Sequence, residues 1–179
     1  DEKDFREVFD TVRRVYGMEN CHEITLEANP DDLCPEYLQM LSELPFNRIS
    51  MGIQTFDDTT LKLLKRRHNA AQAIRAVELC RAHGFRNISI DLIYGLPGET
   101  TERWEKDLQQ AIALDVEHIS AYHLIYEEGT PIYKMLQKHQ VEEVDEDSSV
   151  RFFTLLIDRL REAGYEHYEI SNFCKPGMY

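Results

Sequence analysis

Alternating apolar and polar stretches along the chain predict short strands separated by amphipathic helices. Runs rich in Ile, Leu, Met and Ala predict strands over residues 24–28, 48–54, 88–94, 118–126 and 168–170. Apolar residues at helical spacing predict helices near the start of the chain and over residues 57–64, 70–83, 100–114 and 145–163, with a short helix after Pro131. Strands and helices alternate about every thirty residues, which predicts βαβ units, a parallel sheet and an α/β fold in one domain.

Residues 29–32, after the first predicted strand, predict the start of a helix. Asn29 is suited to cap the first free amides, Pro30 tolerates the first helical position, and Asp31 and Asp32 suit the positive end of the helix dipole. The apolar stripe of this predicted helix is formed by Tyr37, Leu38, Leu41 and Leu44. The pattern therefore predicts one helix that begins at Asn29.

Composition and charge narrow the class of protein. The 179 residues are 42% hydrophobic and 30% charged, with a formal net charge of −13, so the chain can bury a core beneath an acidic surface. Such a charge argues against non-specific binding to nucleic acid or to an anionic membrane. The sequence has neither a long apolar run nor a basic-then-apolar leader, which makes the cytoplasm the expected location.

The four cysteines are best interpreted as reduced thiols. Their spacing fits neither a disulfide framework nor a paired zinc motif, so we expect no metal site in this chain.

Three polar side chains interrupt the apolar strands near their carboxyl ends, where ligands of parallel α/β proteins collect. These are Glu27, Gln54 and Asp91. Each taken alone also fits a helix cap or a hydrogen-bonded core residue, but their recurrence in successive units favours a binding site. Arg66 follows the next helix; it is either a solvated cation at that helix end or a guanidinium fork for a ligand carboxylate. Gly95-Leu96-Pro97-Gly98 predicts a turn.

Four segments in order resemble the radical S-adenosylmethionine family, within it the branch of the oxygen-independent coproporphyrinogen III oxidases and the related haem chaperones. The segments are Glu27-Ala28-Asn29-Pro30, residues 48–56, residues 91–98 and residues 168–173. Residues 120–124 and 128–131 and the Asn-Phe-x-x-Pro-Gly ending are more similar to the haem chaperones than to the oxidases.

The resemblance implies a partial (β/α)6 barrel of the TIM type, open on one side, with ligands at the carboxyl ends of the strands. It implies that Glu27 holds S-adenosylmethionine, that Gln54 and Asp91 bond its polar groups around the ribose, and that Arg66 pairs with its methionine carboxylate. Ile93 would offer backbone contact to the adenine. Residues 1–179 would be one domain, a fragment of the core barrel without its first βα units, with residues from about 145 beginning a C-terminal extension.

One feature of the family is missing. Its three cluster cysteines, spaced C-x3-C-x2-C, have no counterpart here, so a [4Fe-4S] cluster is expected only in a longer parent protein, with its cysteines upstream of Asp1. The resemblance implies haem binding and delivery, with a tetrapyrrole and a haem-accepting protein as partners. The alternative is oxidative decarboxylation of coproporphyrinogen III, so the resemblance leaves open whether the protein is an enzyme, and the fragment alone is expected to be inactive.

Overall fold

A computed structural model describes all residues from 1 to 179. The order of elements is α1 (Glu2–Tyr16), β1 (Thr25–Ala28), the 3-10 turn η1 (Pro30–Asp32), α2 (Pro35–Ser42), β2 (Arg48–Gln54), α3 (Asp58–Leu63), α4 (Ala70–Ala82), β3 (Asn87–Tyr94), α5 (Thr101–Ala113), β4 (His118–His123), α6 (Pro131–Gln137), α7 (Glu146–Glu162), β5 (Glu166–Glu169) and β6 (Asn172–Cys174). This order confirms the predicted alternation of strands and helices.

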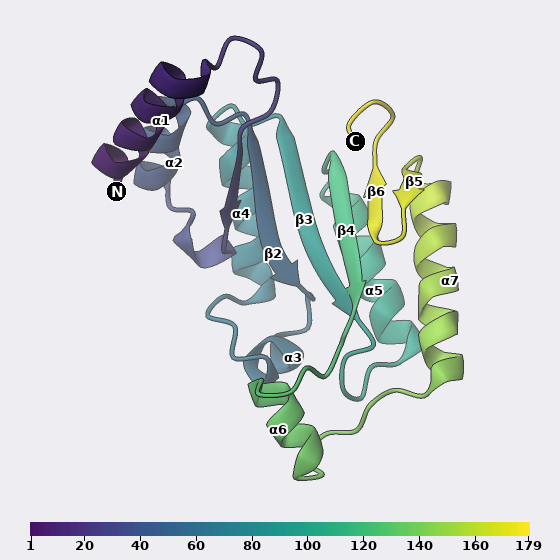
Figure 1. The fold of residues 1–179 in the computed structure, drawn as a ribbon. Coiled ribbons are helices and arrows are strands. Elements are labelled where there is room, and N and C mark those ends of the chain that lie inside the picture. Colours follow the sequence, from purple (N-terminus) through teal and green to yellow (C-terminus); the bar gives the residue numbers. More distant parts are fainter.

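The strands form one sheet in the order β1-β2-β3-β4-β6-β5. The four strands from β1 to β4 are parallel, as the sequence pattern predicts, and β6 and β5 add an antiparallel pair beyond β4. In Figure 1 the arrowheads of β2 and β3 point to the same end of the sheet, and α3 and α6 lie at that end. The carboxyl ends of the parallel strands therefore share one edge of the molecule with two short helices.

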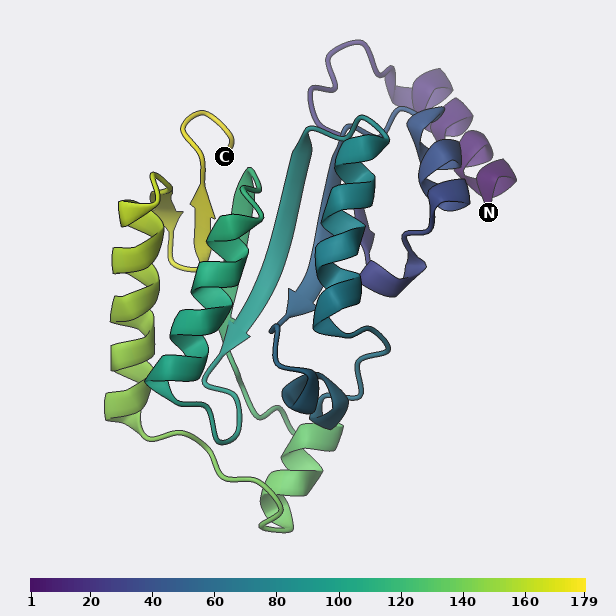
Figure 2. The same ribbon diagram turned by 180° about the vertical axis from the view of Figure 1, so that it is seen from behind.

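Helices α4, α5 and α7 cover only one face of the sheet. Figures 1 and 2 show α4, α5 and α7 side by side on that face, whereas no helix crosses the opposite face. Parallel sheets are usually buried on both faces. A parallel sheet with one uncovered face is what part of a barrel wall presents, with helices outside and the barrel interior on the other side. The arrangement confirms the predicted α/β fold of the partial barrel type.

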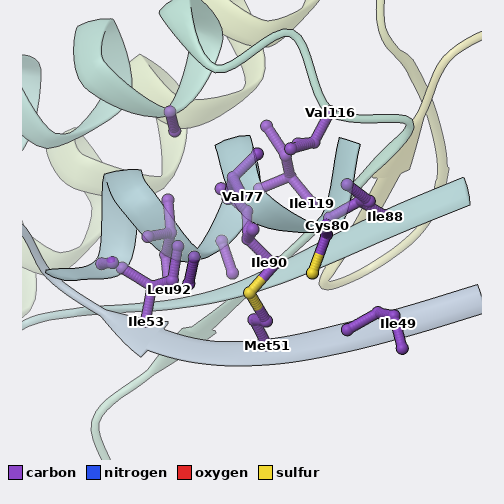
Figure 3. Packing of buried hydrophobic residues seen from close by; sticks show 14 of the residues in the cluster. Ile49, Met51, Ile53, Val77, Cys80, Ile88, Ile90, Leu92, Val116 and Ile119 are labelled. Carbon is purple, nitrogen blue, oxygen red and sulfur yellow. The ribbon is translucent and has the colours of Figure 1, made fainter. Parts of the chain in front are cut away.

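The core lies between the sheet and these helices. Buried and half-buried residues alternate along β2, and its buried side chains Ile49, Met51 and Ile53 face the helices. Figure 3 shows them packed with side chains from the neighbouring strands β3 and β4 and with Val77 and Cys80 of α4. The strict alternation leaves every second side chain of β2 on the uncovered face, and these are polar or small.

The prediction of one helix that begins at Asn29 is wrong. The chain forms the short turn η1 and then starts α2 at Pro35, because Cys34 before that proline is extended and proline is suited to the first turn of a new helix. Asn29 makes no side-chain cap. Its side chain is instead available for contacts at the carboxyl end of β1.

The end of the chain also differs from the sequence prediction. One short strand was expected over residues 168–170, but the chain forms the hairpin of β5 and β6, and β6 pairs with β4. Short runs such as Asn172–Cys174 carry too little pattern to separate a strand from a turn. The hairpin and α7 contribute Phe152, Leu156 and Phe173 to the same core as the parallel strands.

Candidate functional site

The uncovered face of the sheet is polar along all four parallel strands. The side chains that alternate onto this face include Thr25, Glu27, Arg48, Ser50, Gln54, Ser89, Asp91, His118 and Ser120. The registers place Glu27 beside Ser50, and Asp91 between Gly52 and Ser120. Polar groups from all four parallel strands therefore meet on this face of the sheet.

A hollow of about 350 Å³ opens on this face. Its lining consists of Glu27, Ala28, Asn29, Ser50, Gly52 and Asp91. Two of the predicted site residues, Glu27 and Asp91, thus line one hollow from separate strands. They differ in environment, because Glu27 stands exposed on the edge strand β1 whereas Asp91 is half-buried in the middle of β3.

Asp91 is held in a setting that opposes its negative charge. Burial and the neighbouring Glu27 carboxylate raise its pKa from 3.8 to about 6, against the opposing effect of the Ser120 hydroxyl and of Arg48 and Arg66. A carboxyl group with this pKa is ionised at neutral pH at a cost to the fold, and hydroxyl or ammonium donors of a ligand would offset that cost. Asp91 is therefore prepared to accept hydrogen bonds from a bound molecule.

Gln54 occupies an irregular end of β2. Gly52 pairs with Asp91 but Gln54 pairs with Leu92, so Ile53 is an extra residue and the strand bulges. Gln54 itself has φ 74°, in the left-handed region that residues other than glycine rarely adopt. Bulges and backbone strain of this kind occur next to binding sites, where they redirect a side chain.

Arg66 reaches the same place from the segment after α3. Its Nη2 donates to the Asn29 side-chain oxygen at 2.9 Å and to the Gly52 carbonyl at 2.8 Å. Its Nε and Nη1 donate to no protein group, so part of the guanidinium fork stays available to an anion. Arg66 is therefore more than a solvated cation at a helix end, because its side chain bonds Asn29 directly after β1 and Gly52 in β2.

Gly52 brings these side chains together. A Cβ added there would lie 2.8 Å from Gln54 Nε2 and 3.0 Å from Arg66 Nη2, which is too close for either group. The structure thus gathers all four predicted residues around Gly52: Glu27 and Asp91 line the hollow, and Gln54 and Arg66 close over the glycine. Ile93, expected to contact adenine, lies on the same face two residues beyond Asp91 and beside Tyr122.

Neither Gly52 nor the contact role of Asn29 is predicted by the sequence pattern. A single glycine inside a predicted strand is a recognised signal of a bulge or of close approach by another group, and it could have identified Gly52. Asn29 carried no such signal, because Asn before Pro fits a helix cap equally well. Its pairing with Arg66 spans 37 positions and appears only in the folded chain.

The cysteines do not form a site. Cys21 and Cys34 are exposed on loops, whereas Cys80 and Cys174 are buried in α4 and β6. No group of three or more His, Cys, Asp or Glu side chains is placed to hold a metal ion. These residues therefore do not fit an iron–sulfur cluster, which needs thiolates gathered at one point.

The hydrogen-bonding groups of Glu27, Gln54, Arg66 and Asp91 suit a small polar ligand that carries both positive and negative groups. The free part of the Arg66 fork can bind a carboxylate, while Glu27, Asp91 and Gln54 can accept from hydroxyl or ammonium groups. An amino-acid end together with a sugar carries these groups. No helix combines the length and apolar character needed to span a membrane.

Comparison with known proteins assigns the class. The sequence profile of the Radical SAM superfamily matches residues 3–111, which is more than half of the chain. The chain belongs to the Radical SAM superfamily. The matched segment contains all four residues gathered around Gly52.

Within this superfamily, the chain is similar to haem chaperones and to a related mitochondrial protein. The chain is 37% identical over 178 residues to the haem chaperone HemW of Bacillus subtilis, covering 99% of this chain and 47% of the relative. It is 35% identical over 155 residues to mouse radical S-adenosyl methionine domain-containing protein 1, mitochondrial, covering 87% of this chain and 35% of the relative. The chain spans about half the length of the curated relatives it matches or less.

A solved structure agrees with the fold. The coproporphyrinogen III oxidase HemN of Escherichia coli, described as a radical SAM enzyme, superimposes with a TM-score of 0.84 at 22% identity. The match covers 99% of this chain and 41% of HemN. At that identity the likeness supports the architecture alone.

Proposed function

We propose that this chain is the S-adenosylmethionine-binding part of a haem chaperone of the HemW kind. The observation that carries the proposal is the gathering of Glu27, Gln54, Arg66 and Asp91 around Gly52. Arg66 would bind the methionine carboxylate through its free Nε and Nη1. Glu27, Gln54 and Asp91 would bond the ribose hydroxyls and the ammonium group, with Ile93 offering backbone contact to the adenine.

Domain organisation and the remaining partners concern the whole protein. We propose that residues 1–179 are one domain of a longer cytoplasmic protein, in which residues from about 145 begin a C-terminal extension. The shared core of α7, the β5–β6 hairpin and the parallel strands supports treating them as one unit. A [4Fe-4S] cluster would be supplied by cysteines outside this chain, and when bound it would supply electrons to S-adenosylmethionine. Haem and a haem-accepting protein would be the further partners.

Haem delivery is favoured over porphyrinogen oxidation by charge as well as by similarity. The segment from Glu127 to Asp147 carries seven acidic residues against two lysines. It includes α6, which lies at the carboxyl-end edge of the sheet (Figure 1). An oxidase must hold several propionate groups, which calls for basic residues facing the site rather than an acidic rim.

Anaerobic turnover of the full-length protein tests this choice. With its cluster reconstituted and with S-adenosylmethionine and a reductant present, it should bind haem but release no CO₂ from coproporphyrinogen III. Haem binding would be measured by absorbance titration and products by chromatography. Accumulation of protoporphyrinogen IX beyond one equivalent per protein would contradict the chaperone function and support the oxidase.

A further inference from the structure

The bulge at the end of β2 is a point where side chains bind the strand's backbone carbonyls. Ile53 is the extra residue between the pairs Gly52–Asp91 and Gln54–Leu92. Two side chains from one short segment bind the carbonyls at this point. Arg66 donates to Gly52, and His68 contacts the Ile53 oxygen at 3.0 Å through Nε2.

The contact fixes the state of the His68 ring. A carbonyl oxygen can only accept, so Nε2 carries the proton and the ring donates it to Ile53. His68 is 3% exposed, and it is the one buried side chain between α3 and α4. Its Nδ1 is buried without a partner. An unpaired buried nitrogen is costly, and the Nε2–H bond to Ile53 is the hydrogen bond that offsets the burial of the ring.

The position of His68 links it to the proposed ligand groups on both sides. Arg66 lies two residues before it, and Gln54, with its left-handed backbone, directly follows the carbonyl that His68 binds. The Ile53 carbonyl also accepts from the Thr55 amide at 3.0 Å, which tightens the chain around Gln54. Movement of His68 would therefore shift Gln54 and the segment that carries Arg66 together.

We propose that His68 is a positioning residue for the S-adenosylmethionine site, which rests on the proposed function. Its Nε2–H clamps the bulged end of β2 to the Arg66 segment, and this holds Gln54 and Arg66 in the geometry that binds the ligand. His68 touches no ligand itself. Its hydrogen bond, rather than the volume of its ring, carries the role.

Two substitutions separate the hydrogen bond from the ring volume. His68→Phe keeps a ring of similar shape but loses the donor, whereas His68→Gln keeps an N–H donor and loses the ring. His83→Phe is the matched control, because His83 donates in the same manner to the Leu79 carbonyl at 2.8 Å but does so at the end of α4, away from the site. Affinity of the 179-residue chain for S-adenosylmethionine would be measured by calorimetric titration.

We expect His68→Phe to weaken binding about 10-fold, His68→Gln to stay within about 3-fold of the original chain, and His83→Phe to leave affinity unchanged. A packing role makes the opposite prediction, with Phe tolerated and Gln defective, and that result would overturn the proposal. If His68→Phe does not fold, the Gln variant still decides between the two roles.

A ligand-free measurement keeps this test separate from the proposed function. The Gln54 side-chain amide gives its own proton–nitrogen signals in an NMR spectrum. They should shift in His68→Phe and stay in place in His83→Phe. Failure of the original chain to bind S-adenosylmethionine would count against the proposed function alone, whereas unmoved Gln54 signals in His68→Phe would overturn the role of His68.

Discussion

Because Gly52 has no side chain, the side chains of Gln54 and Arg66 can both lie against its Cα. In Gly52→Ala the new methyl group would meet both side chains at about 3 Å, and both are flexible ends that can move aside. We therefore expect S-adenosylmethionine affinity to fall about 10-fold or more with little change in the free energy of unfolding. Calorimetric titration and chemical denaturation would measure the two quantities.

Gly84→Ala is the matched control for this variant. Gly84 has φ 91° at the end of α4 and open space around it, so alanine there strains the backbone and costs about 1–2 kcal/mol of stability. Its affinity should not change. Equal loss of affinity in both variants would mean that Gly52 acts only through stability.

We expect Asp91 to lower the stability of the fold and to strengthen ligand binding. Its pKa is raised to about 6, so the folded chain holds the proton more tightly than the unfolded chain, and stability falls as pH rises from about 4 to about 6. Asp91→Asn removes this penalty. We expect the variant to be more stable than the original chain by about 1–3 kcal/mol at pH 7.5, with no difference below pH 4.

The same variant should lose affinity for S-adenosylmethionine, because an amide accepts fewer hydrogen bonds and carries no charge. Denaturation at several pH values and titration at pH 7.5 would test both effects. An Asn variant that is less stable at pH 7.5 would show that Asp91 is a structural residue satisfied by its neighbours.

At the scale of elements, His118 joins β4 to the terminal hairpin. Its ring bonds the Ser89 hydroxyl at 2.9 Å and the Tyr168 hydroxyl at 2.8 Å, and it is nearly buried. Burial, aided by Arg48, lowers its pKa from 6.5 to about 4. The unfolded chain then takes up the proton first on acidification, so stability is lost as pH falls from 6.5 to about 4.

We expect the chain to lose about 2–3 kcal/mol from this residue between pH 7.5 and pH 4.5. His118→Asn should be less stable at pH 7.5 and should lack this part of the pH dependence. Paired denaturation curves at the two pH values would measure the difference, and the same pH slope in both proteins would exclude His118 as its source.

The elements differ in how well their own residues specify them. Strands such as β2 and β3 follow from their apolar alternation, and α4 and α5 follow from periodicity and caps such as Asn69 and Thr100. The helix expected at Asn29 failed because Pro35 restarts the chain, and β6 was missed because its three residues pair only through tertiary contact with β4. Local pattern thus specifies long elements, and long-range pairing decides the short ones.

At the scale of the whole molecule, the site lies on a polar sheet face that no helix covers (Figures 1 and 2). The sequence predicted that Glu27, Gln54, Arg66 and Asp91 would meet, since parallel strands end at one edge and the family motif marks those positions. It could not predict Asn29 and His68 as partners of Arg66 and Ile53, because those contacts span 37 and 15 positions and depend on the bulge. Residue type and the family motif thus predict a candidate site, whereas the contacts of Asn29 and His68 are visible only in the fold.

We expect this edge of the sheet to bind S-adenosylmethionine through Arg66. Calorimetric titration of the ligand into the chain and into Arg66→Ala, Arg66→Lys and Arg67→Ala measures the contribution of this side chain. Arg67 is the matched control, because it is the adjacent arginine but its exposed side chain pairs with Asp31 and Asp32. We predict that Arg66→Ala loses about 10- to 150-fold in affinity, that lysine recovers little of it, and that Arg67→Ala stays within about 3-fold. Equal affinities in the Arg66 and Arg67 variants would contradict this prediction.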